Sequence, residues 1–358
     1  MQHKLNKITS VNLDLLRAVA VSCVYFSHLI GAIRAPTFGS LGRFGVIIFF
    51  VHTSLVLMES LERSESAAGG DSLLVRVFWL RRAFRIYPLA MLTVLIVACC
   101  RVPFAPGLAY TWIGGKSFLS NFFLVQNLTR KPDILGPLWS LPLEVQMYII
   151  LPFAYFAVRG RLHYRSIVLW IVSVAFALTL PTLSSRLNVF LFAPCFTSGI
   201  VAYDLLRSQR WKWKLPSWTW PIGIVVFIML FGPHDNVDFT IKIRRAWGIS
   251  LLLGVLCANV KELPSGVLQR ICHWIAEHSY GIYLSHVILI WFAIDRISTA
   301  HLWIRIVVLI VTSFAIPALL YVSVEKPFIL MGNHLAGRIY RERQKRISLQ
   351  QVHATLID

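Results

Sequence analysis

Three ionisable side chains lie within one apolar segment near the start of the chain, LDLLRAVAVSCVYFSHLI at residues 13–30. Arg17 and His28 are eleven residues apart, which is about 16 Å of helix and close to three full turns, so both lie on nearly the same helical face. Asp14 is three residues before Arg17 and can pair with it. A histidine can remove a proton from a hydroxyl group near neutral pH. We therefore treat His28 as a candidate general base, with hydrogen bonding to a neighbouring helix as the alternative.

The elements that must position these residues are membrane-spanning helices. Of the 358 residues, 57% are hydrophobic and only 14% are charged, and the mean hydropathy is +0.67. A soluble domain of this length could not cover its surface with so few charges. The apolar residues fall in ten uncharged stretches, each near the ~17–25 residues that span a bilayer. The stretches lie between residues 17 and 34, 43 and 59, 85 and 101, 144 and 159, 165 and 186, 186 and 204, 214 and 235, 245 and 261, 277 and 295, and 305 and 325.

This pattern predicts an all-α polytopic membrane protein with about ten transmembrane helices. The net charge of +19 could indicate nucleic acid binding, but its distribution indicates membrane topology instead. With the N-terminus inside, 22 Lys and Arg residues fall on inside segments and 10 on outside loops. This asymmetry predicts that both termini are cytoplasmic, and we expect a multi-pass protein of the cell inner (cytoplasmic) membrane that binds no nucleic acid.

The predicted organisation is a single membrane domain between two short tails. Residues 1–12 form a cytoplasmic N-terminal tail, 13–328 the membrane domain, and 329–358 a basic cytoplasmic tail that is a frayed helix or disordered. The outside segment 102–137 is rich in Gly, Pro and aromatic residues, which suits a re-entrant or capping element over a cavity. The six cysteines show neither a paired framework nor a C-x-x-C, so we expect no metal site.

Six sequence motifs resemble, in order, those of the acyltransferase-3 family of membrane acyltransferases. The first, at residues 13–28, matches the R-x10-H motif of that family. The others are GRFGVIIFFVHTSLVL (42–57), RRAFRIYP (81–88), LWSLPLEVQMYIILP (138–152), SYGIYLSH (279–286) and VEKPF (324–328). The resemblance covers residues 13 to 328. Many members also carry a C-terminal hydrolase-like domain, and for this chain we expect a stand-alone form or one that works with a separate partner.

The resemblance implies O-acyl transfer from a cytoplasmic acyl-CoA, most often acetyl-CoA, to a hydroxyl of a glycan or lipid-linked saccharide. It assigns the motif histidine to His28 and the motif arginine to Arg17, and the R-x-x-R arginines to Arg82 and Arg85. Coenzyme A carries several phosphate charges, and an arginine cluster with Arg81 beside it offers bidentate sites for them. The alternative for these arginines is anchoring at the cytoplasmic surface.

Several further residues are candidates for the site. Glu144 enters its span from the outside and should lie as deep as His28, where it could orient that imidazole as an aspartate does in a hydrolase triad; a structural pair is the alternative. Tyr283 and His286 should lie nearer the cytoplasm and line the donor channel, unless they only pack. Trp139, with Ser140, could form the outer rim of the cavity. Glu325 is interpreted as structural.

The chain departs from the family pattern in its second span, where Thr53 and Ser54 replace Ser-Gly and His52 replaces an apolar residue. Counting residues from the loop between the first two spans places His52 about 5 Å from the depth of His28. We therefore expect His52 to keep His28 neutral by electrostatic repulsion, unless it faces another helix.

The runner-up interpretation is a secondary transporter or permease that uses His28, Glu144 and Arg17 as a polar path, and a third is a non-catalytic scaffold. A transporter predicts internal inverted repeats, which we do not find in the sequence. The acceptor stays open between exopolysaccharide, O-antigen, a lipo-oligosaccharide and a macrolide-type small molecule.

Overall fold

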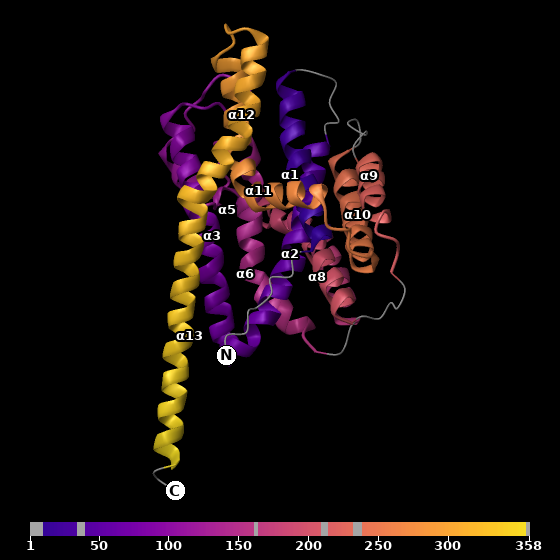
Figure 1. Ribbon diagram of the computed structural model, residues 1–358, viewed down its shortest axis with the longest axis vertical. Coiled ribbons are helices and arrows are strands. Elements are labelled where there is room, and N and C mark those ends of the chain that lie inside the picture. The colour runs from indigo at the N-terminus through magenta and orange to yellow at the C-terminus, as the bar shows by residue number, and fades with distance from the viewer. Residues whose placement is uncertain (1–9, 34–39, 161–163, 209–213, 232–237, 356–358) are drawn as a thin grey trace.

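The computed structural model describes residues 10–33, 40–160, 164–208, 214–231 and 238–355. Within these ranges the regular structure is helical, apart from one isolated bridge between Leu215 and Val260. This helical content confirms the all-α prediction. Most helices run along the long axis of the molecule (Figure 1). The α-helices are α1 (Val11–Ala32), α2 (Leu41–Ala68), α3 (Asp71–Cys99), α4 (Gly115–Phe122), α5 (Gln126–Thr129), α6 (Leu141–Val158), α7 (Tyr164–Leu183), α8 (Ala193–Ser208), α9 (Thr219–Phe231), α10 (Phe239–Asn259), α11 (Val267–Trp291), α12 (Leu302–Leu320) and α13 (Lys326–Thr355).

A multi-pass membrane architecture follows from the length and composition of these helices. Seven segments of the described chain are long and apolar enough to cross a membrane, and α9 is a shorter apolar helix. Each of the ten stretches chosen from the sequence overlaps a helix, although α10 and α11 fall outside the seven. The number ten and the cytoplasmic position of the termini stay predictions. Residues 1–9 of the expected N-terminal tail lie outside the described residues.

The beginning of α1 is fastened to the segment that follows α10. The Ser10 hydroxyl caps α1 by accepting a hydrogen bond from Leu13 N, and it donates to Glu262 Oε1 at 2.7 Å. The Asn12 amide donates to the carbonyl of Lys261 and accepts from the backbone N–H of Leu263. These contacts fix the end of α1 that carries Arg17.

The hairpin of α1 and α2 is set by close helix contact at glycine. A Cβ added at Gly45 would lie 2.4 Å from the carbonyl oxygen of Ala20, and one at Gly42 would lie 2.9 Å from Ser27 Oγ. Small residues let membrane helices approach in this way and pack by van der Waals contact. The pairing of position 42 with 27 therefore defines the register of the hairpin, and Gly45 packs over the turn of α1 from Ala20 to Val24.

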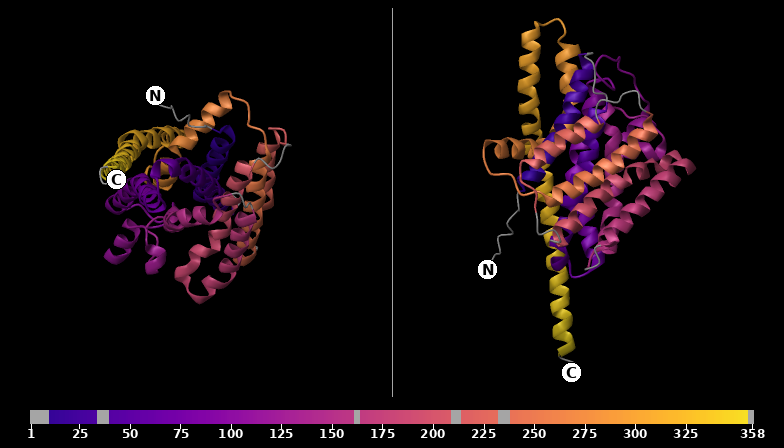
Figure 2. Two further views of the ribbon diagram at one scale, coloured as in Figure 1. Left: turned by 90° about the horizontal axis from the view of Figure 1, so that it is seen from below. Right: turned by 90° about the vertical axis from the view of Figure 1, so that its right-hand side faces the viewer.

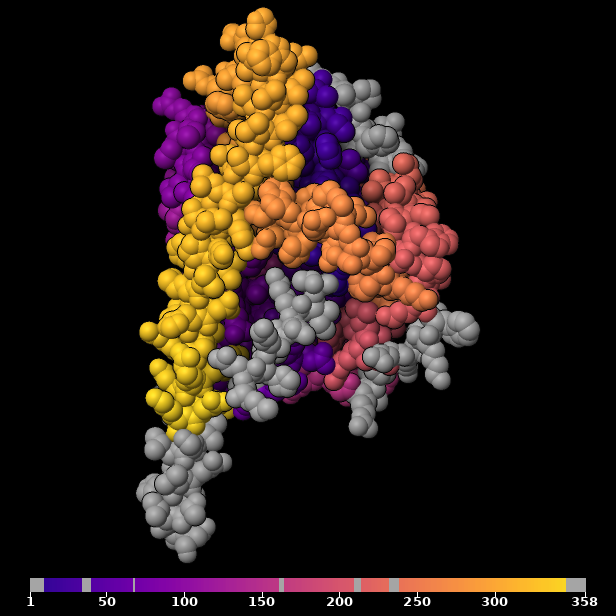
Figure 3. All heavy atoms as spheres, viewed as in Figure 1, coloured from indigo at the N-terminus to yellow at the C-terminus, as the bar shows by residue number. Residues whose placement is uncertain are grey.

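The last two helices form a ridge along one edge of the molecule (Figures 1 and 3). The π-helix η4 (Tyr321–Glu325) joins α12 to α13, and α13 runs alongside α3 and stands at the edge of the bundle when it is seen from below (Figure 2). Ala336 packs against Leu73 and Val77 of α3, and Arg343 donates to the Gly69 carbonyl at 2.9 Å. Of the two alternatives for this tail, a frayed helix or a disordered segment, the described part is a helix, because α3 supplies an apolar face on which it docks.

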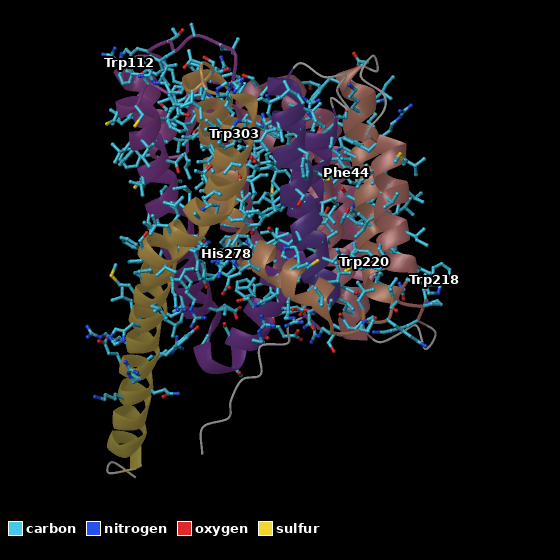
Figure 4. All side chains as sticks on the ribbon, turned by 45° about the horizontal axis from the view of Figure 1, so that its top comes forward. Phe44, Trp112, Trp218, Trp220, His278 and Trp303 are labelled. Carbon is cyan, nitrogen blue, oxygen red and sulfur yellow. The ribbon has the colours of Figure 1, made fainter. Side chains whose placement is uncertain are left out.

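Tryptophans mark both ends of the bundle. Trp112 of the loop before α4 and Trp303 of α12 are 53% and 65% exposed, and Trp218 before α9 is 61% exposed. Figure 4 shows Trp112 and Trp303 towards one end and Trp218 nearer the other. Exposed tryptophans at two levels are typical of the two membrane–water interfaces.

Candidate active site

A cavity of about 470 Å³ opens beside His28 in the half of the bundle that holds the loop between α3 and α6. We call it the outer cavity. His28 comes from α1, Trp139 from the 3-10 helix η1 (Gly136–Ser140), and Tyr283 from α11. The loop 102–137, expected to cap a cavity, contributes Asn127 and Pro137 to its wall. His28 therefore faces a space large enough for a sugar-sized group.

His286 lies beside His28, with the two ring centroids 5.1 Å apart. Its Nδ1 donates a hydrogen bond to the carbonyl oxygen of Tyr283 at 2.7 Å, because a carbonyl can only accept. Nδ1 thus carries a proton. Nε2 is buried and has no hydrogen-bond partner among the described residues, so a second proton there would have no acceptor, which favours the neutral ring with a lone pair on Nε2. The expectation that His286 lies nearer the cytoplasm than His28 was wrong. The first part of α11 runs across the long axis (Figure 1), so residue 286 reaches only the level of His28.

A second, smaller cavity of about 50 Å³ lies against the other half of α1, and we call it the inner cavity. Arg17, Arg82 and Arg85 all line it. The Nε of Arg17 donates to Ser279 Oγ at 2.7 Å, and its guanidinium lies 5.3 Å from the centre of the Phe49 ring. The three arginines that the sequence motifs singled out are thus brought together although they come from two helices.

The expected pairing of Asp14 with Arg17 is replaced by a contact between Asp14 and a histidine. Asp14 Oδ2 lies 2.8 Å from Nδ1 of His273 on α11. Because Arg17 is held by Ser279 instead, its guanidinium keeps donors for other groups in the inner cavity.

Two carboxylates balance part of this positive charge. Glu144 is buried and accepts a hydrogen bond from the Tyr148 hydroxyl one turn further along α6. Glu325 is buried at η4, with its Oε2 4.0 Å from Arg85 Nη2, which fits the structural interpretation. Three arginines against two carboxylates leave one positive charge in excess, so the inner cavity suits an anion.

The prediction that Glu144 orients His28 was wrong. Pro137 and Trp139 of η1 already lie at the level of His28, and Glu144 follows them deeper into the bundle. Its carboxylate faces the inner cavity and not the outer one. The depth of Glu144 was estimated from the sequence by counting residues from the membrane surface. That count did not include the 3-10 helix η1, which precedes α6.

The predicted coupling of His52 to His28 was also wrong. The hairpin register pairs position 42 with 27, so position 52, ten residues further along α2, lies level with Arg17, ten residues back along α1. His52 accordingly lines the inner cavity, where its Nδ1 is buried without a hydrogen-bond partner in the described chain. Counting residues from the loop placed His52 at the wrong depth because the two helices do not end at the same level. α1 continues to Ala32, whereas α2 begins at Leu41, close to the level of Ser27.

A narrow pocket of about 20 Å³, which we call the throat, lies between the two cavities and has lining residues in common with each. It shares Val24, Val46 and Tyr283 with the outer cavity. It shares the following residues with the inner cavity: Phe49, Glu144 and Tyr280. The Tyr283 hydroxyl donates to the Pro137 carbonyl at 2.6 Å and bonds the Ser140 hydroxyl at 2.7 Å. The side chains therefore line one path from the arginine cluster to His28.

Arg81 lies apart from the inner cavity. It lines a neighbouring small pocket with Arg82 and Tyr340, and its guanidinium is 5.9 Å from the centre of the Tyr340 ring. Sequence reasoning missed Tyr148 and Tyr280, both within quoted motifs, and Asn127, which no motif indicates. Within the described ranges, no group of three or more His, Cys, Asp and Glu side chains is placed to hold a metal ion.

Comparison with known proteins supports an enzymatic interpretation of this arrangement. A family model described as an acyltransferase domain matches residues 10–322. The peptidoglycan O-acetyltransferase OatA of Listeria monocytogenes is 26% identical over 91% of this chain and 57% of its own length. Acyltransferase MdmB of Streptomyces mycarofaciens is 27% identical over 70% of this chain and 69% of its own. Nodulation protein 10 of Rhizobium leguminosarum bv. viciae is 24% identical over 91% of this chain and 95% of its own length. The chain thus spans little more than half of the Listeria relative, and no solved structure matches it.

Proposed function

This chain belongs to the acyltransferase family whose model covers residues 10–322, and we propose that it is a membrane O-acyltransferase. The donor is a cytoplasmic acyl-CoA, in the simplest case acetyl-CoA, and the acceptor is a hydroxyl of a glycan such as exopolysaccharide, O-antigen or lipo-oligosaccharide. The protein acts in the cell inner membrane. One observation carries the proposal: a throat that shares lining residues with both lies between a cationic cavity and a cavity that holds a histidine.

The inner cavity is the donor side. Arg82 and Arg85 bind anionic groups of acyl-CoA, and Arg17 extends the positive charge toward the throat. The Nε of Arg82 is buried without a partner among the described residues, so its desolvation is compensated only when a ligand accepts from it. The throat is largely apolar and suits the thin arm that carries the thioester. It must widen for that arm to pass, since about 20 Å³ holds little more than one water molecule.

The outer cavity is the acceptor side, and His28 is the base. His28 takes the proton of the acceptor hydroxyl as the oxygen attacks the thioester carbonyl carbon. The new C–O bond forms, the C–S bond breaks, and the departing thiolate takes the proton back from the imidazolium to leave CoA as a thiol. The lone pair on His286 Nε2 can accept a hydrogen bond from His28, which stabilises the imidazolium while it carries the proton.

The test uses purified protein in lipid nanodiscs with acetyl-CoA labelled in the acetyl group. We expect saturable binding of the donor and slow release of acetate, since water can replace the acceptor. Deletion of the gene should remove ester groups from a surface glycan, as measured by mass spectrometry. The proposal is contradicted if the protein binds no acyl-CoA, or if the deletion strain has unchanged glycan esters. A secondary transporter would then be the better interpretation.

A further inference from the structure

The outer cavity contains two hydrogen-bond donors that proton transfer does not require. They are the guanidinium of Arg43 in the first turn of α2 and the side-chain amide of Asn127 in α5. Arg43 lies within the quoted motif at 42–57 but was given no role there, and Asn127 lies in no quoted motif. Both line the same cavity as His28, so a group that they hold would lie next to the reacting hydroxyl.

The amide of Asn127 has a fixed orientation. Gln146 of α6 donates from Nε2 to Asn127 Oδ1 at 2.9 Å, so the oxygen is engaged and the NH₂ group points elsewhere. That Nδ2 is buried and has no hydrogen-bond partner in the described chain. An unsatisfied buried donor costs about 1–3 kcal/mol. A ligand oxygen that accepts from Nδ2 removes this cost.

Arg43 supplies a charge that the cavity wall does not neutralise. No Asp or Glu is among the described residues that line the outer cavity, and the guanidinium of Arg43 lies 5.1 Å from the centre of the Phe239 ring. Asp238 is next to Phe239, but its carboxylate accepts from Thr240 N at 2.7 Å and caps α10. A guanidinium that packs against a ring can still form two parallel hydrogen bonds to an oxyanion through its edge.

We propose that the acceptor carries an anionic oxygen group, a carboxylate or a phosphate, close to the hydroxyl that is acylated. Arg43 and Asn127 Nδ2 bind this group, and His28 faces the hydroxyl. The aromatic wall made by Trp139 and Phe192, whose ring centroids are 5.4 Å apart, covers the apolar face of the sugar. This inference rests on the proposed function, because it names the substrate class of the same site.

The test measures binding of three small probes to the protein in nanodiscs by saturation-transfer NMR, in the absence of acyl-CoA. The probes are methyl β-glucoside, methyl β-glucuronide and glucose 6-phosphate, so the two charged probes also separate carboxylate from phosphate. At least one charged probe should bind about 10- to 100-fold more tightly than the glucoside. The variants Arg43→Gln and Asn127→Asp should each remove most of this preference.

The matched control is Arg244→Gln, which removes one exposed positive charge from the same end of the molecule without touching the cavity. It should leave the preference intact. Charged probes that bind no better than the glucoside, or equal losses in Arg43→Gln and Arg244→Gln, overturn the inference. Acetyl-CoA binding is measured separately on the same nanodiscs. If the unmodified protein binds no acetyl-CoA but still prefers the charged probes, the acyltransferase proposal is refuted and the anion site is supported.

Discussion

At the scale of single residues, His28 lies between an open cavity and an imidazole whose Nδ1 is protonated. The bond from His286 to the Tyr283 carbonyl places one proton on Nδ1, and the buried Nε2 has no acceptor in the described chain for a second proton, which favours the neutral imidazole. An imidazolium at His28 therefore meets a lone pair and not a second positive charge. This arrangement favours a proton carrier at His28 over a histidine that only fills space.

His28→Ala should lower acyl transfer by roughly 10²–10⁴-fold, which is the usual contribution of one general base. Acyl-CoA binding should persist, because His28 does not line the inner cavity. The measurement is turnover of labelled acetyl-CoA with parallel equilibrium binding. Near-normal turnover would remove His28 from the mechanism.

The double variant Arg82→Ala, Arg85→Ala should weaken acyl-CoA binding, and raised salt should imitate part of that loss in the intact protein. The corresponding lysine variant should recover only part of the affinity, because lysine lacks the planar fork that binds a phosphate by two hydrogen bonds. Arg101→Ala, at an exposed position outside the inner cavity, is the control. Equal affinity in the double variant and the control would show that Arg82 and Arg85 only anchor the helix.

The individual residues show where sequence reasoning succeeded and failed. Arg17 and His28 share a face of α1 because helical periodicity alone decides it, and both line cavities. Glu144 and His52 were placed at the wrong depth because depth depends on where a helix starts relative to its neighbours. The 3-10 helix η1 sets where α6 starts, and the offset between α1 and α2 sets where α2 starts. Neither feature produces a periodic pattern in the sequence.

At the scale of elements, the contact between α1 and α2 holds both cavities and the throat in register. Gly45 lines the throat and touches Ala20 of α1 through its backbone. The helices themselves could be predicted from hydropathy. Their closest contacts could not, because small residues occur on many faces and the sequence does not say which face meets which helix.

Gly45→Ala should destabilise the protein by about 1–3 kcal/mol, the usual cost of overpacking, since the new Cβ would lie 2.4 Å from the Ala20 carbonyl oxygen. Acyl transfer should fall as α1 and α2 move apart at the throat. Gly248→Ala is the matched control, because a Cβ at Gly248 has no neighbour within 4 Å. The comparison is thermal unfolding in detergent, and equal melting temperatures for the two variants would contradict the contact.

At the scale of the whole molecule, the two cavities lie against opposite halves of α1, in a bundle with exposed tryptophans towards both ends (Figure 4). The proposed reaction therefore requires a definite sidedness. The arginine cluster must open toward the compartment that contains acyl-CoA, and His28 toward the glycan. The distribution of Lys and Arg predicts this same orientation, with the turn between α2 and α3 inside.

Cysteine labelling tests this orientation. The background variant Cys99→Ser, Cys100→Ser removes the two exposed thiols of the described chain. Leu108→Cys then places a thiol in the loop beside the outer cavity, and Ser66→Cys places one near the end of α2; both positions are exposed. A membrane-impermeant maleimide should label Leu108→Cys in intact cells and Ser66→Cys only after permeabilisation. The reverse pattern would put His28 on the cytoplasmic side and the arginines outside, where they could not meet a cytoplasmic acyl-CoA.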